Sequence, residues 1–122
     1  MNKTVIEILE HEGPASFVTA GNDGPHMAAT WNSYIEIASD SVVIIPVGSL
    51  KKTEENIHAG SKVQMIVASK DIQGKNGPGA GFLLKGTAQF KNTGMDFERT
   101  RSRFPWARAI MLFTIEEETP LL

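Results

Sequence analysis

The sequence consists largely of short β-favouring runs separated by clusters of turn residues at hairpin spacing. Residues 16–20 and 26–38 flank a Gly-Asn-Asp-Gly cluster at positions 21–24, which predicts two antiparallel strands joined by a hairpin. The run Val42–Val47 is continuous and largely β-branched, as expected for a strand buried on both faces. Three later runs predict strands at residues 62–69, 82–90 and 108–115. About six strands in this order predict a mainly β fold, in which a closed or split antiparallel barrel would bury them without exposed edges.

Short helical patterns are inserted between these strands. Thr4 and Glu7 have the spacing of a capping box, an apolar stripe follows, and Gly13 provides a stop, so a helix is predicted near the start of the chain. Residues 51–59 contain good helix formers and end at a glycine. Residues 95–104 have a looser helical pattern that a proline ends. The expected fold is therefore mainly β with short helices.

Length and charge limit the classes of function. A chain of 122 residues with 41% hydrophobic residues predicts one domain, residues 1–122, and a second copy would add buried surface. The net charge of −2 disfavours a nucleic-acid partner. The absence of cysteine excludes thiolate catalysis and cysteine-bound metals. No apolar run reaches the roughly 18 residues of a membrane span. Residues 1–12 do not resemble a signal peptide, so we expect a soluble, cytoplasmic protein.

One segment has the features of an anion site. Gly48 and Ser49 follow a strand, and Lys51, Lys52 and Thr53 open the next predicted helix. Free N–H groups at a helix N-terminus, together with cations and hydroxyls, favour a phosphate monoester. The spacing differs from that of a nucleoside-triphosphate P-loop. The alternative is that Ser49 or Thr53 only caps the helix and the lysines are solvated.

A second candidate segment is the Thr-Trp-Asn-Ser-Tyr run at positions 30–34. Strand alternation would place Trp31 and Ser33 on one face and Thr30, Asn32 and Tyr34 on the other, so that the polar face could line a pocket for a ring rich in acceptors. The alternative is a core tryptophan beside a polar outer face. The same choice applies to the tryptophan at position 106.

The glycine-rich segment 74–81, which includes Gly79, predicts irregular structure that continues from residue 70. It would let backbone amides approach a flat ligand, although a surface loop is the simpler interpretation. The three histidines have no metal-ligand spacing, and no catalytic triad or paired carboxylates can be picked out. We therefore expect no metal site, and no residue is predicted to be catalytic.

Four separated segments together resemble one known family. They are DGPHMAATWNSY at 23–34, IPVG at 45–48 with the following Lys-Thr-Glu, NGPGAGF at 76–82 and WARA at 106–109. In order and spacing they are similar to the small FMN-binding proteins of sulfate-reducing bacteria, and the similarity runs over nearly the whole chain. The resemblance implies the FMN-binding split-barrel family, which is related to pyridoxamine-phosphate oxidases and flavin reductases.

This resemblance implies a six-stranded antiparallel split β-barrel that forms a homodimer and holds FMN non-covalently near the subunit interface. The phosphate would be held by Lys52 and Thr53. Hydrogen bonds to the flavin or its ribityl chain would come from Thr30, Asn32 and Ser33. The backbone would approach the ligand at Val47, Gly48 and Ser49. The isoalloxazine would lie near Trp31, Tyr34 and Trp106, and Leu122 would cover it from the other subunit.

FMN supplies its own redox chemistry, so the protein needs only to bind and orient it. The expected function is a small flavoprotein electron carrier for a redox partner protein. The alternatives are an FMN-dependent oxidoreductase, either an NAD(P)H-dependent flavin reductase or an enzyme like pyridoxamine-phosphate oxidase. A small barrel that binds single-stranded nucleic acid or a protein through its aromatic residues is a third possibility, which the charge disfavours.

Overall fold

The computed structural model describes all residues, 1–122, and contains one seven-stranded antiparallel sheet with the order β2-β1-β5-β6-β7-β4-β3. The strands are β1 (Pro14–Gly21), β2 (Gly24–Trp31), β3 (Glu36–Ile37), β4 (Val42–Val47), β5 (Val63–Gly74), β6 (Gly77–Lys91) and β7 (Ala109–Pro120). The helices are α1 (Lys3–Leu9), α2 (Lys51–His58) and α3 (Met95–Arg103). The sheet is not closed, because its end strands β2 and β3 are not paired with each other. The predicted mainly β, split antiparallel architecture is confirmed, and none of the helices is long and apolar enough to cross a membrane.

The prediction of six strands was wrong by one, because the segment 26–38 does not form a continuous strand. A 3-10 turn, η1 (Asn32–Tyr34), separates β2 from β3. The side-chain amide of Asn32 donates to the carbonyls of Ile8, His11 and Ala68 at 3.4, 3.0 and 3.2 Å. These contacts fix Asn32 in the interior and turn the chain, so strand alternation does not continue past Trp31.

The prediction of irregular structure for the glycine-rich segment 74–81 was wrong, because this segment is part of a long hairpin. Strands β5 and β6 pair as far as Gly74 and Gly77 and are joined by a two-residue turn. A Cβ on Gly74 would lie 2.2 Å from the carbonyl oxygen of Gly79, so the glycines allow the two backbones to approach closely. The C-terminal segment also differs from the prediction, because β7 continues to Pro120 and pairs there with Phe82 of β6.

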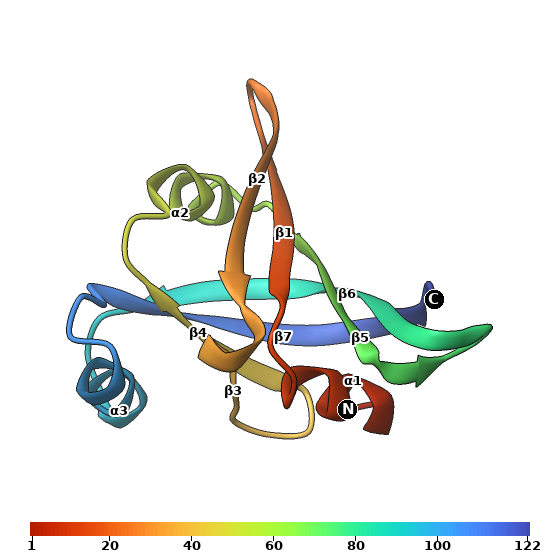
Figure 1. Cartoon of the computed structure of the whole chain (residues 1–122). Coiled ribbons are helices and arrows are strands. Elements are labelled where there is room, and N and C mark those ends of the chain that lie inside the picture. Colours follow the sequence, from red (N-terminus) through yellow and green to blue (C-terminus); the bar gives the residue numbers. More distant parts are fainter.

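The main core is formed by residues of β1, β4, β5, β6 and β7 that pack together with residues of α1 and α2. Its largest fully buried side chains include Phe17 of β1, Met65 of β5 and Phe113 of β7. Helix α1 packs on β5 and β6, and α2 packs on β1 beside the projecting β1–β2 hairpin (Figure 1). Helix α3 buries Phe97 in a second, smaller cluster with residues of β4 and β7.

All three predicted helices are present, but the first begins and ends differently from the prediction. Asn2, and not Thr4, is the N-cap of α1, and its side chain accepts from the N–H of Thr4 at 2.8 Å. The helix ends at Leu9, before Gly13.

Candidate functional site

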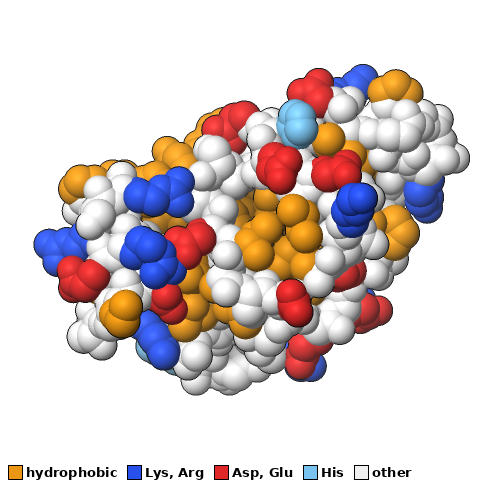
Figure 2. Space-filling model, turned by 90° about the horizontal axis from the view of Figure 1, so that it is seen from below, with side chains coloured by type: hydrophobic (Ala, Val, Ile, Leu, Met, Phe, Trp, Pro, Cys, Tyr) orange, Lys and Arg blue, Asp and Glu red, His pale blue; other side chains and the backbone are white.

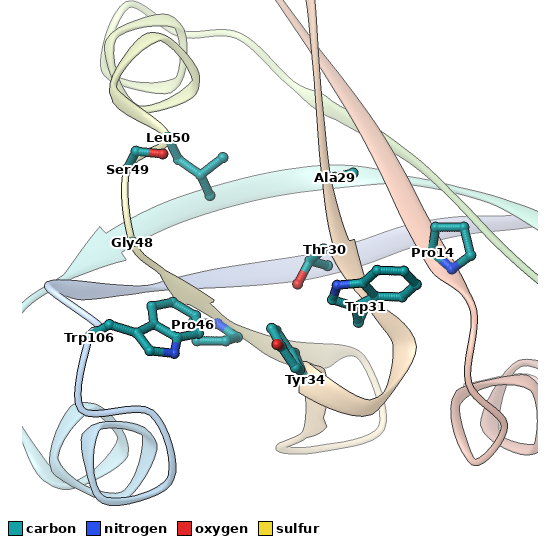
Figure 3. Close-up of a pocket in the computed structure, with 10 residues that line it drawn as sticks. All are labelled: Pro14, Ala29, Thr30, Trp31, Tyr34, Pro46, Gly48, Ser49, Leu50 and Trp106. Carbon is teal, nitrogen blue, oxygen red and sulfur yellow. The ribbon is translucent and has the colours of Figure 1, made fainter.

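A cleft of about 330 Å³ opens between the end of β2, the end of β4 and the segment that joins α3 to β7. It is called the aromatic cleft here, and Figure 3 shows its lining residues: Pro14, Ala29, Thr30, Trp31, Tyr34, Pro46, Gly48, Ser49, Leu50 and Trp106. The cleft thus brings together six of the predicted site residues, from two regions far apart in the sequence and from the segment near position 106. Its volume is within the usual range for small-ligand pockets.

Two tryptophans form opposite walls of the aromatic cleft, with Tyr34 between them (Figure 3). Trp31 is 47% exposed and Trp106 is 50% exposed, so neither is the core residue of the alternative interpretation. The ring of Tyr34 is 6.0 Å from that of Trp106 and 4.8 Å from that of Phe104. These half-exposed rings form an apolar surface suited to a flat aromatic ligand.

Two residues of the site, Phe104 and Leu50, are not among those predicted from the sequence. Phe104 supports Trp106, with ring centroids 5.4 Å apart, and the aromatic spacing Phe104, Pro105, Trp106 could have indicated it. Leu50 lines the cleft as the N-cap of α2 and has a φ of 52°, which is rare for a residue other than glycine. No sequence signal indicates that conformation, because leucine does not favour it.

The N-terminus of α2 borders the cleft and lacks a side-chain cap. The N-cap is Leu50, so neither Ser49 nor Thr53 caps the helix, and that alternative interpretation was wrong. The first N–H groups of a helix have no acceptor within it. Thr53 is fully buried in the first turn, and its Oγ1 has no hydrogen-bond partner. An uncapped helix end with an unpaired buried hydroxyl is suited to an anion such as a phosphate.

Lys52 belongs to a different part of the surface. Its Nζ lies 3.1 Å from a carboxylate oxygen of Asp23 and 3.8 Å from one of Glu55. It lines a polar recess of about 490 Å³ beside the β1–β2 hairpin, together with Asn22 and Asn56, and does not line the aromatic cleft. The hydrogen bond from Lys52 is the main cause that lowers the pKa of Asp23. In this arrangement the carboxylates hold the lysine that the sequence assigns to the phosphate.

Three other predicted residues surround the cleft without lining it. Asn32 is fully buried, its Nδ2 is committed to backbone carbonyls, and its Oδ1 has no partner. Ser33 Oγ donates to the Glu12 carboxylate at 2.5 Å, and this bond is the main cause that lowers the pKa of Glu12. Val47 is fully buried and pairs with Ala109 across the β4–β7 ladder. Asn32 and Ser33 therefore hold the turn that carries Tyr34.

Gly79 and Leu122 lie together at the other end of the molecule. The N–H groups of Leu121 and Leu122 donate to the carbonyl of Gly81, and a Cβ on Gly81 would lie 3.1 Å from Leu122 Cδ1. Neither Gly79 nor Leu122 lines the aromatic cleft of its own chain, and Leu122 is 58% exposed. Its contact with a second subunit remains a prediction.

The cleft is chemically suited to binding. Its lining contains no Asp, Glu, His, Lys or Arg, and the chain has no cluster of His, Asp and Glu residues that could hold a metal ion. The lining offers aromatic faces, one threonine and one serine hydroxyl, a tyrosine hydroxyl and the backbone of residues 48–50. These groups can sandwich and orient a flat ligand but supply no strong acid or base.

Comparison with known proteins identifies the family. No family model matches the chain. A protein from Nitratidesulfovibrio vulgaris named "FMN-binding protein" is 42% identical over 112 residues, which are 92% of this chain and 91% of that protein.

Solved structures with the same fold have low sequence identity. HupZ from Group A Streptococcus superposes with a TM-score of 0.80 at 15% identity, over 99% of this chain and 94% of that chain. An FMN-binding protein from Syntrophomonas wolfei superposes with a TM-score of 0.71 at 17% identity, over 88% of this chain and 76% of that chain. The structural matches show the fold, and the identity with the Nitratidesulfovibrio protein extends over nearly both chains. This chain therefore belongs to the family of the small FMN-binding proteins with the split-barrel fold.

Proposed function

We propose that this protein binds one FMN per subunit non-covalently in the aromatic cleft and acts as a small electron carrier. The observation that carries the proposal is the uncapped N-terminus of α2, where Ser49 and Leu50 line the cleft together with two half-exposed indoles. A phosphate monoester fits the first feature and an isoalloxazine ring fits the second. The relative in Nitratidesulfovibrio vulgaris is named for FMN binding, which supports the same ligand here.

The residues fit FMN in three further respects. Gly48 approaches the cleft without a Cβ, and an added Cβ would lie 3.3 Å from Trp106 Cε3, so glycine preserves this close packing. Thr30 lies between the tryptophans and presents a hydroxyl to the cleft (Figure 3). Lys52, in the same helical turn as Thr53, would leave Asp23 to pair with the phosphate. When bound, FMN would supply the redox chemistry, while the chain binds and orients it.

The carrier function is favoured over an enzymatic one by the lining of the cleft. A substrate such as pyridoxamine phosphate carries its own charges, and the lining offers no charged side chain to pair with them. An NAD(P)H-dependent flavin reductase would need only access to one ring face, and it remains the alternative. Anaerobic mixing with NADH or NADPH separates the two: rapid bleaching of bound flavin indicates a reductase, whereas stable oxidised flavin over minutes supports a carrier.

We also propose that the chain is a single domain, that it forms a homodimer and that it is located in the cytoplasm. Hydrophobic side chains gather in the middle of one face, bordered by charged ones (Figure 2). On the sheet surface, Met27 and Ile66 are 71% and 46% exposed and line a small apolar groove. A second copy would bury such surface, and the exposed Leu122 could then reach a neighbouring flavin. Sedimentation of the purified protein at several concentrations tests the dimer, and a monomer at all of them would contradict it.

Flavin titration tests the binding proposal. The intrinsic emission of FMN should be strongly quenched on binding, because aromatic side chains lie beside the ring. Trp31→Ala should restore part of that emission. Lys52→Ala should weaken FMN binding far more than riboflavin binding, because riboflavin has no phosphate. Unquenched emission in fully bound protein, or equal losses for the two ligands in Lys52→Ala, would contradict the proposed placement.

A further inference from the structure

Arg108, just before β7, contacts the loop that precedes α2. Its Nε donates to the carbonyls of Gly48 and Ser49 at 3.0 and 3.1 Å, and its Nη2 donates to Ser49 O at 2.6 Å. Its backbone N–H donates to the carbonyl of Val47 at 2.8 Å. The arginine thus fixes the end of β4 and the next two peptide groups together.

The direction of these bonds determines where the loop presents its own donors. In a planar trans peptide, the C=O and the following N–H point in opposite directions. Because Arg108 holds the carbonyls of Gly48 and Ser49, the N–H groups of Ser49 and Leu50 point away from the guanidinium. Neither N–H group donates in any of the turn, loop or cap hydrogen bonds of the fold. Ser49 and Leu50 line the aromatic cleft, whereas Arg108 does not.

Arg108 instead lines a separate recess with Glu54 and His58, and its Nη2 donates to Glu54 Oε1 at 2.9 Å. Glu54 is the acidic residue in the first turn of α2, where its charge would oppose an anion bound at the helix end. Pairing with Arg108 directs this carboxylate to the recess and offsets its charge.

The backbone of this loop needs such support. Leu50 adopts the left-handed conformation, which is unfavourable for a leucine and persists only where surrounding contacts determine it. The two carbonyls that precede Leu50 along the chain are those that Arg108 holds. A single planar guanidinium reaches both carbonyls and the carboxylate with donors on two nitrogens, whereas a lysine has all its donors on one nitrogen and lacks this fork.

We propose that Arg108 is a positioning residue that orients the N–H groups of Ser49 and Leu50 for a phosphate monoester and keeps Glu54 from opposing it. This inference rests on the proposed FMN site. Arg108 acts through the loop from outside the cleft and does not touch the ligand. It therefore sets the preference of the protein for FMN over riboflavin.

The test compares Arg108→Met and Arg108→Lys with the wild type and with the control Arg99→Met. Arg99 donates to the carboxylates of Glu36 and Asp96 and does not line the aromatic cleft, so its loss removes comparable ion pairs elsewhere. Hydrogen exchange of the Glu54 amide is measured in each ligand-free protein, because its N–H donates to the carbonyl of Leu50 at 3.0 Å and is protected only while the loop keeps its conformation. Dissociation constants for FMN and riboflavin are then measured by fluorescence titration.

Arg108→Met should speed exchange at Glu54 and weaken FMN binding about tenfold, with little change for riboflavin. Arg108→Lys should behave similarly, because it keeps the charge but not the fork of donors. Arg99→Met should leave both quantities at wild-type values. Unchanged exchange in Arg108→Met, or wild-type FMN binding by Arg108→Lys, would overturn the inference.

The proposed FMN site and the proposed positioning role of Arg108 can fail separately. If wild-type protein binds FMN no better than riboflavin, the phosphate site itself is wrong. Exchange in ligand-free Arg108→Met still decides whether Arg108 orders the loop. If wild-type protein prefers FMN and Arg108→Met loses equal affinity for both flavins, the phosphate site stands and the positioning role of Arg108 is refuted.

Discussion

The N-termini of α1 and α2 satisfy the same physical requirement in different ways. At α1, the side chain of Asn2 accepts from the N–H of Thr4, and the backbone N–H of Asn2 donates to the carboxylate of Glu118. At α2, no side chain caps the helix, the N-cap Leu50 is in a left-handed conformation, and Thr53 Oγ1 is buried without a partner. The first arrangement satisfies the N–H of Thr4 within the chain, whereas we propose that a ligand completes the second.

The difference indicates where stability and function are located. A helix end that follows the local rules contributes to folding, and one that breaks them is a candidate functional site. Gly94, the N-cap of α3, has no side-chain cap either, and both helices have acidic residues in the first turn, Glu54 in α2 and Asp96 and Glu98 in α3. Only α2 combines an uncapped end with an adjacent aromatic cleft.

The largest expected effect is that of Thr53→Val. Valine keeps the shape of threonine and removes the unpaired hydroxyl, so the free energy of unfolding of the ligand-free protein should not decrease. FMN binding should weaken by about 2 kcal/mol, the value of a hydrogen bond to a charged group, and riboflavin binding should change little. Calorimetric titration with both flavins measures the difference. A less stable ligand-free protein with unchanged FMN affinity would make Thr53 merely structural.

A smaller effect is expected for Asn2→Ala, and it should fall on the stability of the protein and not on FMN binding. Loss of the α1 cap should lower the free energy of unfolding by about 1 kcal/mol. The ratio of FMN to riboflavin affinity should stay at the wild-type value, because Asn2 does not line the aromatic cleft. Urea unfolding and flavin titration measure the two quantities. A changed affinity ratio would remove the contrast between the two helix ends.

The smallest expected effect is that of Asp23→Asn. Asparagine cannot hold Lys52 as an ion pair, so the lysine is freer to meet a phosphate, and FMN should bind about two- to threefold more tightly at low salt. The gain should shrink as salt is added. Tighter binding of riboflavin by the same factor would show that Lys52 is not the reason.

The pH dependence of the same pair has a definite sign. The pKa of Asp23 is lowered from its ordinary value of 3.8, mainly by the hydrogen bond from Lys52. The pair is therefore fully formed above pH 3.8 and is lost as pH falls through the lower pKa of the folded protein. Nuclear magnetic resonance titration of the Asp23 carboxyl should show this lowered pKa in wild type and a return toward 3.8 in Lys52→Ala.

Part of the fold could be predicted because its signals are local. The hairpin at positions 21–24, the strand Val42–Val47 and the helix at 51–59 each follow from neighbouring residues, and the structure contains all three. The break in the segment 26–38 could not be predicted, since Asn32 is anchored by carbonyls of α1, of the segment that follows it and of β5. The glycines of 74–81 favour a loop on composition, yet pairing between β5 and β6 extends through them.

The candidate site, like the fold, could be predicted from the sequence only in part. Trp31, Tyr34, Gly48 and Trp106 stand out by residue type and motif, and the structure places all four in one cleft. Lys52 was chosen by its position in a motif, but the structure pairs it with Asp23 of the β1–β2 hairpin. The orientation of its side chain depends on which carboxylates the fold brings near.

The sequence alone determined most of the strand and helix segments, the motifs that mark the family and the residue types of the site, because these depend on neighbours along the chain or on composition. Only the tertiary structure decided that α2 lacks a cap, that Thr53 Oγ1 is buried without a partner and that Arg108 holds a carbonyl 60 positions away. The physical reason is that a hydrogen bond or a buried, unpaired group is a property of the space around an atom. That space is filled by residues distant in sequence.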